Sequence, residues 1–279
     1  MEYRHTRVMG GKLSGPEWFG QSLRGLCTGR DGRLYAAGDS QVMVFDPAGK
    51  LLRRWATAKP GCSIHLAADG RLFVGQAGQV EIFDGTGKLE RAWQGGWLGE
   101  VTAVRVHGNE TFVADAAARC IRRYDRELKH VNDIGKENRT NGFLIPNGVL
   151  DFDVDSAGGI HAANPGKHRV ERYTREGKLL GHIGRFDGID PEGFPGCCNP
   201  TNMALGPEGR VLVTEKAEPR AKVLDAEGKL LAVLGTKVFD AGSKNMAVAA
   251  DFRGRVYVAE TVKLQILVFE PVRERTEAR

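Results

Sequence analysis

A short pattern recurs six times along this chain and limits its possible folds more than any other feature. Each copy is a five-residue run that alternates apolar and other residues, followed by a turn whose best-preserved form is Asp46-Pro-Ala-Gly-Lys50. The runs occupy residues 41–45, 79–83, 120–124, 169–173, 220–224 and 265–269. Period-two alternation between turn residues is typical of half-buried strands, so each run predicts one strand.

The spacing of the copies predicts how the strands assemble. Successive turns begin at residues 46, 84, 125, 174, 225 and 270, so the copies are 38 to 51 residues apart. A repeat of this length with several short strands is typical of a β-propeller, in which each repeat forms a small sheet that stacks on its neighbours around an axis. The sequence therefore predicts an all-β, six-bladed β-propeller with four strands per blade.

The two ends of the chain are predicted to complete one blade together. The last repeat stops soon after residue 269 without a fourth strand, whereas residues 3–9 carry the pattern of such a strand. Pairing of these segments would close the ring and remove an exposed sheet edge. We therefore expect a single propeller domain over residues 1–271 and a frayed, charged tail at 272–279.

The residues around the strands resemble those of the NHL-repeat family of propellers. Loops of the form Gly…Pro-x-x-Phe…Pro lead into segments such as Val248-Ala-Ala-Asp-Phe-Arg-Gly-Arg-Val-Tyr-Val-Ala-Glu260, which is the best match. The resemblance covers nearly the whole chain and implies a six-bladed ring. It implies no single activity, because the family includes binding scaffolds, RNA-binding proteins and lyases.

Charge and hydropathy argue against several classes of protein. The net charge is +5, but the 40 basic residues are interspersed with 35 acidic ones and form no basic block, which argues against nucleic-acid binding. No apolar run approaches the roughly 18 residues of a membrane span, and the N-terminus lacks the apolar core of a signal peptide. We expect a monomer without a membrane span. A cytoplasmic location and export with loss of a signal both stay open.

Blade geometry predicts which loops share a face of the ring. With strands numbered outward from the axis, the 1–2 and 3–4 turns lie on one face. The 2–3 loops and the blade-to-blade connectors lie on the other, here called the connector face. The long insertions at residues 135–148 and 184–199 fall on the connector face. Long loops on a rigid frame commonly carry function, so we expect a small molecule or a protein partner to bind there.

Adjacent cysteines in the connector before blade 5 are the most unusual feature of that face. The Cα atoms of Cys197 and Cys198 are about 3.8 Å apart, below the usual range for a disulfide, so a bond between them would be strained and easily reduced. Ligation of a soft metal and packing of two small side chains are the other interpretations, and all three stay open. Cys62 is expected on the same rim, whereas Cys27 and Cys120 are expected to be structural.

Polar residues on blades 4 and 5 are predicted to lie beside the cysteine pair. They are Asn164, His168, Asn199, Asn202, Glu215 and Lys216. The segments that contain them resemble a group of bacterial NHL-type proteins with a Gly-Cys-Cys-Asn-Pro motif. We expect these side chains to bind a ligand together with Cys62, Cys197 and Cys198. The alternative is a hydrogen-bond network that only holds the long loops, with Glu215 paired to Lys216 or Arg220.

Potential metal ligands near the axis suggest a second kind of site. His65 and Asp151 are placed on inner strands and Glu260 at the end of a second strand, where the three could hold a divalent metal in the central channel. Capping of turns by such carboxylates is the competing interpretation. Zinc lyases of this fold use several channel histidines. Only His65 is well placed here, which counts against such an enzyme.

Three functions follow from these features. The leading one is a ligand- or protein-binding NHL-type propeller whose working face carries the blade 4 and 5 loops around the channel mouth. The alternative is a metal- or thiol-dependent hydrolase or lyase at the same place, and the third is an RNA-binding NHL module. The sequence contains no Ser-His-Asp order, Gly-x-Ser-x-Gly motif or phosphate loop that would indicate another catalytic class.

Overall fold

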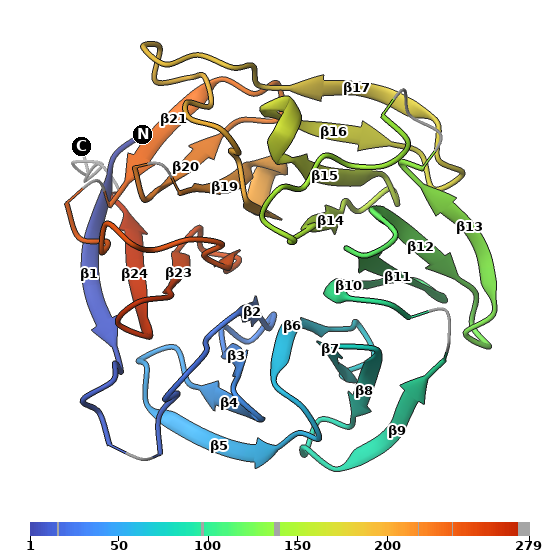
Figure 1. Cartoon of the computed structure of the whole chain (residues 1–279). Coiled ribbons are helices and arrows are strands. Elements are labelled where there is room, and N and C mark those ends of the chain that lie inside the picture. Colours follow the sequence, from blue (N-terminus) through green and yellow to red (C-terminus); the bar gives the residue numbers. More distant parts are fainter. Residues whose placement is uncertain (16, 96–97, 137–139, 217, 236, 273–279) are drawn as a thin grey trace, which may run out of the picture.

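Six four-stranded antiparallel sheets surround a central axis in the computed structural model, which describes residues 1–15, 17–95, 98–136, 140–216, 218–235 and 237–272. Figure 1 shows the sheets as the blades of a propeller. Within the described residues the only helical elements are two single 3₁₀ turns, η1 (Pro165–Lys167) and η2 (Pro207–Gly209). The predicted all-β, six-bladed fold is confirmed.

Blades 1 to 3 follow the chain from β2 to β13, with the strands of each blade given from the axis outward. Blade 1 contains β2 (Gly25–Thr28), β3 (Leu34–Gly38), β4 (Gln41–Phe45) and β5 (Leu51–Ala56). Blade 2 contains β6 (Gly61–Leu66), β7 (Leu72–Gln76), β8 (Gln79–Phe83) and β9 (Leu89–Gln94). Blade 3 contains β10 (Val101–His107), β11 (Glu110–Asp115), β12 (Cys120–Tyr124) and β13 (His130–Ile134).

Blades 4 to 6 repeat this order. Blade 4 contains β14 (Phe152–Val154), β15 (Ile160–Asn164), β16 (Arg169–Tyr173) and β17 (Leu179–Ile183). Blade 5 contains β18 (Asn202–Leu205), β19 (Val211–Glu215), β20 (Arg220–Leu224) and β21 (Leu230–Leu234). Blade 6 contains β22 (Val248–Ala250), β23 (Val256–Glu260), β24 (Gln265–Pro271) and, on its outside, β1 (Tyr3–Met9).

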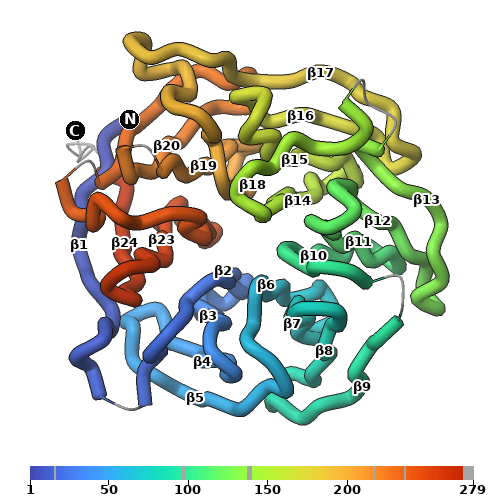
Figure 2. The backbone as a smooth tube through the Cα atoms, viewed as in Figure 1, coloured from blue at the N-terminus to red at the C-terminus, as the bar shows by residue number. Residues whose placement is uncertain are grey.

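The ring is closed by the two ends of the chain, as predicted. Strand β1 pairs antiparallel with β24, from Tyr3 opposite Pro271 to Met9 opposite Ile266. Figure 2 shows this blue N-terminal segment running beside the red C-terminal strands. The connector that leaves β1 adds a further tie, because the Trp18 indole Nε1 donates a hydrogen bond of 2.6 Å to the Leu264 carbonyl. The outer edge of β24 is thereby paired with β1.

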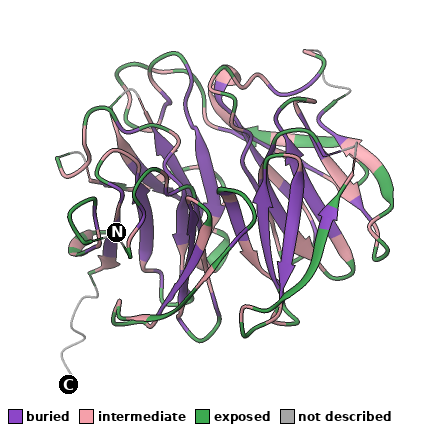
Figure 3. Ribbon diagram, turned by 60° about the horizontal axis from the view of Figure 1, so that its bottom comes forward, coloured by how far each residue is buried: buried purple, intermediate pink, exposed green. Residues whose placement is uncertain are grey.

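Apolar side chains pack between neighbouring blades. Among the described residues, six apolar clusters are found, and each joins two adjacent blades. Phe112 of blade 3, for example, packs in one cluster with Phe152 of blade 4, and both are fully buried. Figure 3 shows the inner strands buried and the outer edges and loops more exposed. Since every blade is packed on both sides, the ring forms a rigid frame for its loops.

The recurrent turn has one hydrogen-bond pattern. The Asp46 carboxylate accepts the amide of Lys50, and the equivalent bond recurs in blades 2, 3 and 5. In blade 4 the Thr174 hydroxyl replaces the carboxylate. The glycine before each lysine has φ between 87° and 94°, a left-handed conformation that favours glycine, and Leu128 takes that position in the degenerate copy with φ 62°. This geometry explains why the motif recurs.

Two predicted segments are only partly described. Residues 137–139 of the predicted connector at 135–148, and residues 273–279 of the predicted tail at 272–279, lie outside the described residues. Val272, which is described, donates its amide to the Glu2 carbonyl at 2.9 Å and so continues the pairing between the chain ends.

Candidate functional site

A pocket of about 290 Å³ opens at the channel mouth on the connector face. Its lining residues lie in the connectors, at the starts of inner strands or just after β23, and every blade supplies at least one of them. They are Gln21, Ser22, Leu23, Arg24, Cys62, Glu100, Thr102, Asn147, Gly148, Val149, Asn202, Lys244, Asn245 and Thr261. The volume is near the lower end of small-ligand sites, which span roughly 300–1,000 Å³.

The lining is polar and carries an excess of positive charge. Arg24 and Lys244 are exposed cations, and Glu100 is the one carboxylate among the lining residues. Asn147 and Asn202 contribute amide groups that can donate and accept hydrogen bonds. The buried Asn202 Oδ1 has no hydrogen-bond partner within the protein, so an acceptor is left over at this wall. The mouth therefore presents two positive charges, amide donors and one unpaired acceptor at its wall.

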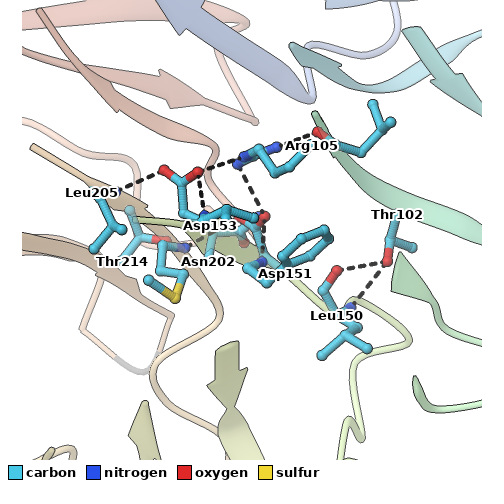
Figure 4. Close-up of polar contacts among 12 residues, drawn as sticks. Thr102, Arg105, Leu150, Asp151, Asp153, Asn202, Leu205 and Thr214 are labelled. Atoms are coloured by element: carbon cyan, nitrogen blue, oxygen red, sulfur yellow. Dashed lines mark hydrogen bonds and ion pairs between the residues drawn. The ribbon is translucent and has the colours of Figure 1, made fainter. Parts of the chain in front are cut away.

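An ion-pair network lies in the channel below the mouth (Figure 4). Arg105 of β10 places Nε 3.0 Å from Asp153 Oδ1 and Nη2 3.6 Å from Asp151 Oδ1. Asp151 Oδ2 accepts hydrogen bonds from Asn202 Nδ2 at 3.1 Å and from the Met203 amide at 3.2 Å. Burial raises the pKa of Asp151, although the Arg105 charge opposes this shift. The Arg105 guanidinium joins blade 3 to blade 4, and the Asp151 carboxylate extends the network to blade 5.

His65 faces the same guanidinium from blade 2. It lines a second channel pocket, of about 160 Å³, with Arg105 and Asp153. Burial, followed by the Arg105 charge, lowers the pKa of His65 to about 4. The imidazole is therefore neutral at neutral pH.

The titration of His65 predicts an acid-sensitive contribution to stability. Its folded-state pKa is depressed below the unfolded value of about 6.5, so the stabilisation is present above pH 6.5 and is lost as pH falls toward 4. Because the ring keeps partial exposure, we expect a loss of about 1–3 kcal/mol over this window. Urea unfolding at pH 7 and pH 4 should show that the free energy of unfolding of His65→Gln falls less between these pH values than that of wild type. Equal losses in the two proteins would contradict the assignment.

The three predicted metal ligands do not form one site. Asp151 is engaged by Arg105 and Asn202, while His65 lies in the second pocket. The buried Glu260 carboxylate accepts hydrogen bonds from the Ser243 hydroxyl and from the amides of residues 262 and 263. The part of the chain that the structure describes contains no group of three His, Cys, Asp or Glu residues arranged to hold a metal. The side chains present do not fit the divalent ion considered from the sequence.

Polar residues at the ends of second strands hold the connectors. Asp39 accepts the amides of residues 20, 21 and 22, and Asp115 accepts those of residues 99 and 118. Asn164 Oδ1 accepts the Leu144 amide at 3.1 Å, and the Glu260 carboxylate accepts the hydroxyl of Ser243, which lies in the connector before blade 6. These contacts favour the loop-holding interpretation for Asn164 and the turn-capping interpretation for Glu260, whose carboxylate also accepts the amides of residues 262 and 263.

Glu215 and Asn199 also have partners inside the protein. The Glu215 carboxylate pairs with Arg220 and with Lys222 of β20, and both its own side chain and that of Lys222 are fully buried. Asn199 is fully buried, donates to the Pro195 carbonyl at 2.7 Å and accepts the Lys216 amide at 2.9 Å. The predicted partner Arg220 is found, but the buried Lys222 is an additional partner that the sequence did not indicate.

The remaining predicted residues lie at or near the rim. His168 follows η1 in a left-handed conformation with φ 54°, and its ring lies 4.9 Å from the Phe186 ring. Lys216 donates through Nζ to Asn147 Oδ1 at 2.6 Å, which links it to the mouth lining. Cys197 and Cys198 are free thiols with their sulfur atoms 3.3 Å apart. Of the nine predicted ligand-binding residues, Cys62 and Asn202 line the pocket itself.

Sequence reasoning missed most of the mouth because it concentrated on blades 4 and 5. Arg24, Glu100, Asn147 and Lys244 lie in connectors before first strands, and Thr102 lies at the start of β10 in blade 3. All five lie within a few residues of the start of a first strand, which is also where Cys62 and Asn202 lie. Superposing the six repeats on their first strands would have placed these residues in one ring.

Comparisons with known proteins show the fold. No protein-family model matches this chain, and no curated protein matches it. The chain is similar to the WD40 β-propeller domain of Doa1 at 15% identity, with a TM-score of 0.63 and coverage of 91% of this chain and 80% of that one. A streptogramin B lyase is similar at 10% identity and TM-score 0.66, covering 95% and 97%. A chain of a mitotic checkpoint complex is similar at 11% identity and TM-score 0.68, covering 96% and 92%.

These identities are too low to carry function, so the shared property is the propeller architecture itself. A propeller scaffold is compatible with binding and protein-interaction roles and, as the lyase shows, with an enzyme. Among the described residues, no helix has the length and apolar character needed to cross a membrane.

Proposed function

We propose that this chain is a binding protein whose ligand is a small polar molecule with an anionic group, held at the channel mouth on the connector face. The observation that carries this proposal is the pocket of about 290 Å³ to which all six blades contribute. Arg24 and Lys244 supply two cations against the single carboxylate of Glu100 in this lining. An anionic group placed between the cations would be favoured both by charge and by hydrogen bonding.

The packing of the ring supports a preformed site. Each first strand is packed between two neighbouring blades, and the connectors above are held by the buried polar groups at second-strand ends. Binding to such a frame costs little ordering of the protein, which favours affinity for a small molecule. A protein partner would require a larger surface than this pocket.

The sequence pattern of the repeats supports a narrower classification. We propose that the chain is an NHL-type propeller, that residues 1–271 act as one domain, and that the blade 4 and 5 loops with Cys197, His168 and Lys216 form the rim beside the mouth. The support is the sequence pattern exemplified at residues 248–260, together with the bond from Lys216 to Asn147.

The test is binding of defined anions to wild-type protein and to the double variant Arg24→Ala/Lys244→Ala. We expect a member of a panel of small carboxylates and sugar phosphates to raise the melting temperature of wild type. At a concentration of 100 Kd the stabilisation is about 2.7 kcal/mol, or roughly 5 °C for a chain of this size. The double variant should lose most of this shift, as measured by thermal unfolding and by calorimetric titration.

The matched control is Lys88→Ala/Arg91→Ala, which removes two exposed cations from the turn before β9 and from β9 itself, away from the mouth. It should retain the full ligand-induced shift. Equal stabilisation of the Arg24→Ala/Lys244→Ala protein would show that the anion binds elsewhere, and the absence of any hit in the panel would reject an anion site at the mouth.

A further inference from the structure

The two adjacent cysteines differ sharply in their access to solvent. Cys197 is exposed, whereas Cys198 is 4% exposed. The Cys198 thiol donates a hydrogen bond to the Cys197 sulfur at 3.3 Å. The pair therefore presents one sulfur atom to solvent and uses the other as an internal hydrogen-bond donor.

A lysine lies next to this exposed sulfur. The hydrogen bond from Cys198 and then the charge of Lys216 hold the pKa of the Cys197 thiol below its ordinary value. The position of Lys216 is defined by two bonds, from its amide to Asn199 Oδ1 at 2.9 Å and from Nζ to Asn147 Oδ1 at 2.6 Å. Reactive cysteines are typically found in partly exposed, electropositive surroundings of this kind.

The other cysteines lack these properties. All five cysteines are in the part of the chain that the structure describes, and Cys197 is the exposed one. Burial raises the pKa of Cys27 and of Cys120 to about 12, and it also raises the pKa of Cys62. Cys197 is thus distinguished by solvent access and by its neighbours.

We propose that Cys197 is a modification site for low-molecular-weight disulfides. The Cys197 thiolate attacks one sulfur of the disulfide, a new S–S bond forms to Cys197, and the old S–S bond breaks. Its electron pair leaves on the second sulfur as a thiolate, so the disulfide is the oxidant and no other reactant is needed. The site lies on the rim beside the anion pocket, where Lys216 bonds to Asn147 of the pocket lining, but its existence does not depend on the proposal of an anion ligand.

The mixed disulfide at Cys197 is the end product. Closure onto Cys198 would require a disulfide between neighbouring residues, whose Cα atoms are about 3.8 Å apart, against a usual minimum of about 4.4 Å. The Cys198 sulfur is also buried, and burial raises its pKa, which lowers its thiolate fraction. Attack by Cys198 on the mixed disulfide is disfavoured on both grounds.

The experiment exposes native protein to oxidised glutathione at pH 7.5 and follows intact mass with peptide mapping. We expect one glutathione adduct, located on Cys197 and reversed by reductant. Lys216→Met should slow the reaction about threefold for each unit by which the thiol pKa rises, because the loss of thiolate outweighs the gain in nucleophilicity. Lys216→Arg should restore most of the rate, and Lys88→Met, on an exposed lysine of blade 2, should leave it unchanged.

Three results would overturn the proposal. One is that Cys62 or another cysteine is modified before Cys197. Another is a product two hydrogens lighter than the reduced protein and without an adduct. The last is an equal rate of modification for wild type and Lys216→Met. Circular dichroism of each variant checks that the ring is folded. Since Cys197→Ser leaves the other four thiols in place, its failure to form the adduct under native conditions provides an independent check of the site.

Discussion

Replacing Glu215 with alanine is expected to lower the free energy of unfolding by about 3–5 kcal/mol. Glu215 Oε1 lies 2.6 Å from the Nζ of Lys222, and the Lys222 side chain is fully buried. That ammonium also donates to the Gly193 carbonyl at 2.5 Å and lies 5.0 Å from the centre of the Phe194 ring. Without the carboxylate, a buried positive charge would keep only neutral partners, and burial already lowers its pKa.

Urea unfolding monitored by circular dichroism measures this loss. The matched control is Glu218→Ala, because Glu218 contacts the same Arg220 but is 81% exposed, and its loss should cost at most about 1 kcal/mol. The double variant Glu215→Leu/Lys222→Leu removes both charges and should recover most of the stability. A Glu215→Ala protein as stable as the Glu218→Ala protein would contradict the expectation.

Arg105→Leu is expected to lower the free energy of unfolding by a similar amount, about 3–5 kcal/mol at pH 7. In this variant the charges left without a partner are negative. It leaves Asp151 and Asp153 facing the channel without their shared guanidinium. Burial already raises the pKa of Asp151, and removing Arg105 raises it further. A carboxyl group with a raised folded-state pKa favours the folded state at low pH and loses that contribution as pH rises through the folded pKa. The free energy of unfolding lost in Arg105→Leu should therefore be smaller at pH 4 than at pH 7.

Arg71→Leu is the matched control, because Arg71 pairs with Asp69 where both side chains are about half exposed. Its cost should be at most about 1 kcal/mol. Unfolding of both variants at pH 4 and pH 7, each compared with wild type at the same pH, gives the required differences. An Arg105→Leu deficit that does not change between the two pH values would show that the carboxylates are not the cause.

The fold was predictable because one physical solution is repeated. The third strands β4, β8, β12, β16 and β20 have the predicted bounds, and β24 continues two residues beyond the predicted 265–269. Each packs against a neighbouring blade, and in blades 1, 2, 4 and 5 the turn that follows contains a left-handed glycine, so local pattern and long-range packing agree. The closure by residues 3–9 was predictable for the same reason, since the last repeat alone lacks an outer partner.

The candidate site was less predictable because polar residues at strand ends have the same appearance whether they bind a ligand or the protein itself. Glu215 finds Lys222 seven residues later on the neighbouring strand, and Asn164 finds the Leu144 amide in the preceding connector. Asp151 was placed correctly near the axis, but its partner Arg105 comes from blade 3. The Glu215–Lys222 contact depends on how β19 pairs with β20, and the Asp151–Arg105 contact on how blades 3 and 4 stack, so sequence spacing alone does not reveal them.

The residues that line the channel mouth are distinct from the side chains that hold its connectors in place. Because each blade provides only one to a few of the lining residues, a substitution such as one at Arg24 or Glu100 alters one sector of the wall. The side chains that hold the connectors, such as Asp39, Asp115 and Glu260, lie elsewhere, at the ends of the second strands, so they need not change with it. For the ligand proposed at the mouth, substitutions could therefore change the contacts of one sector at a time while the other sectors keep theirs.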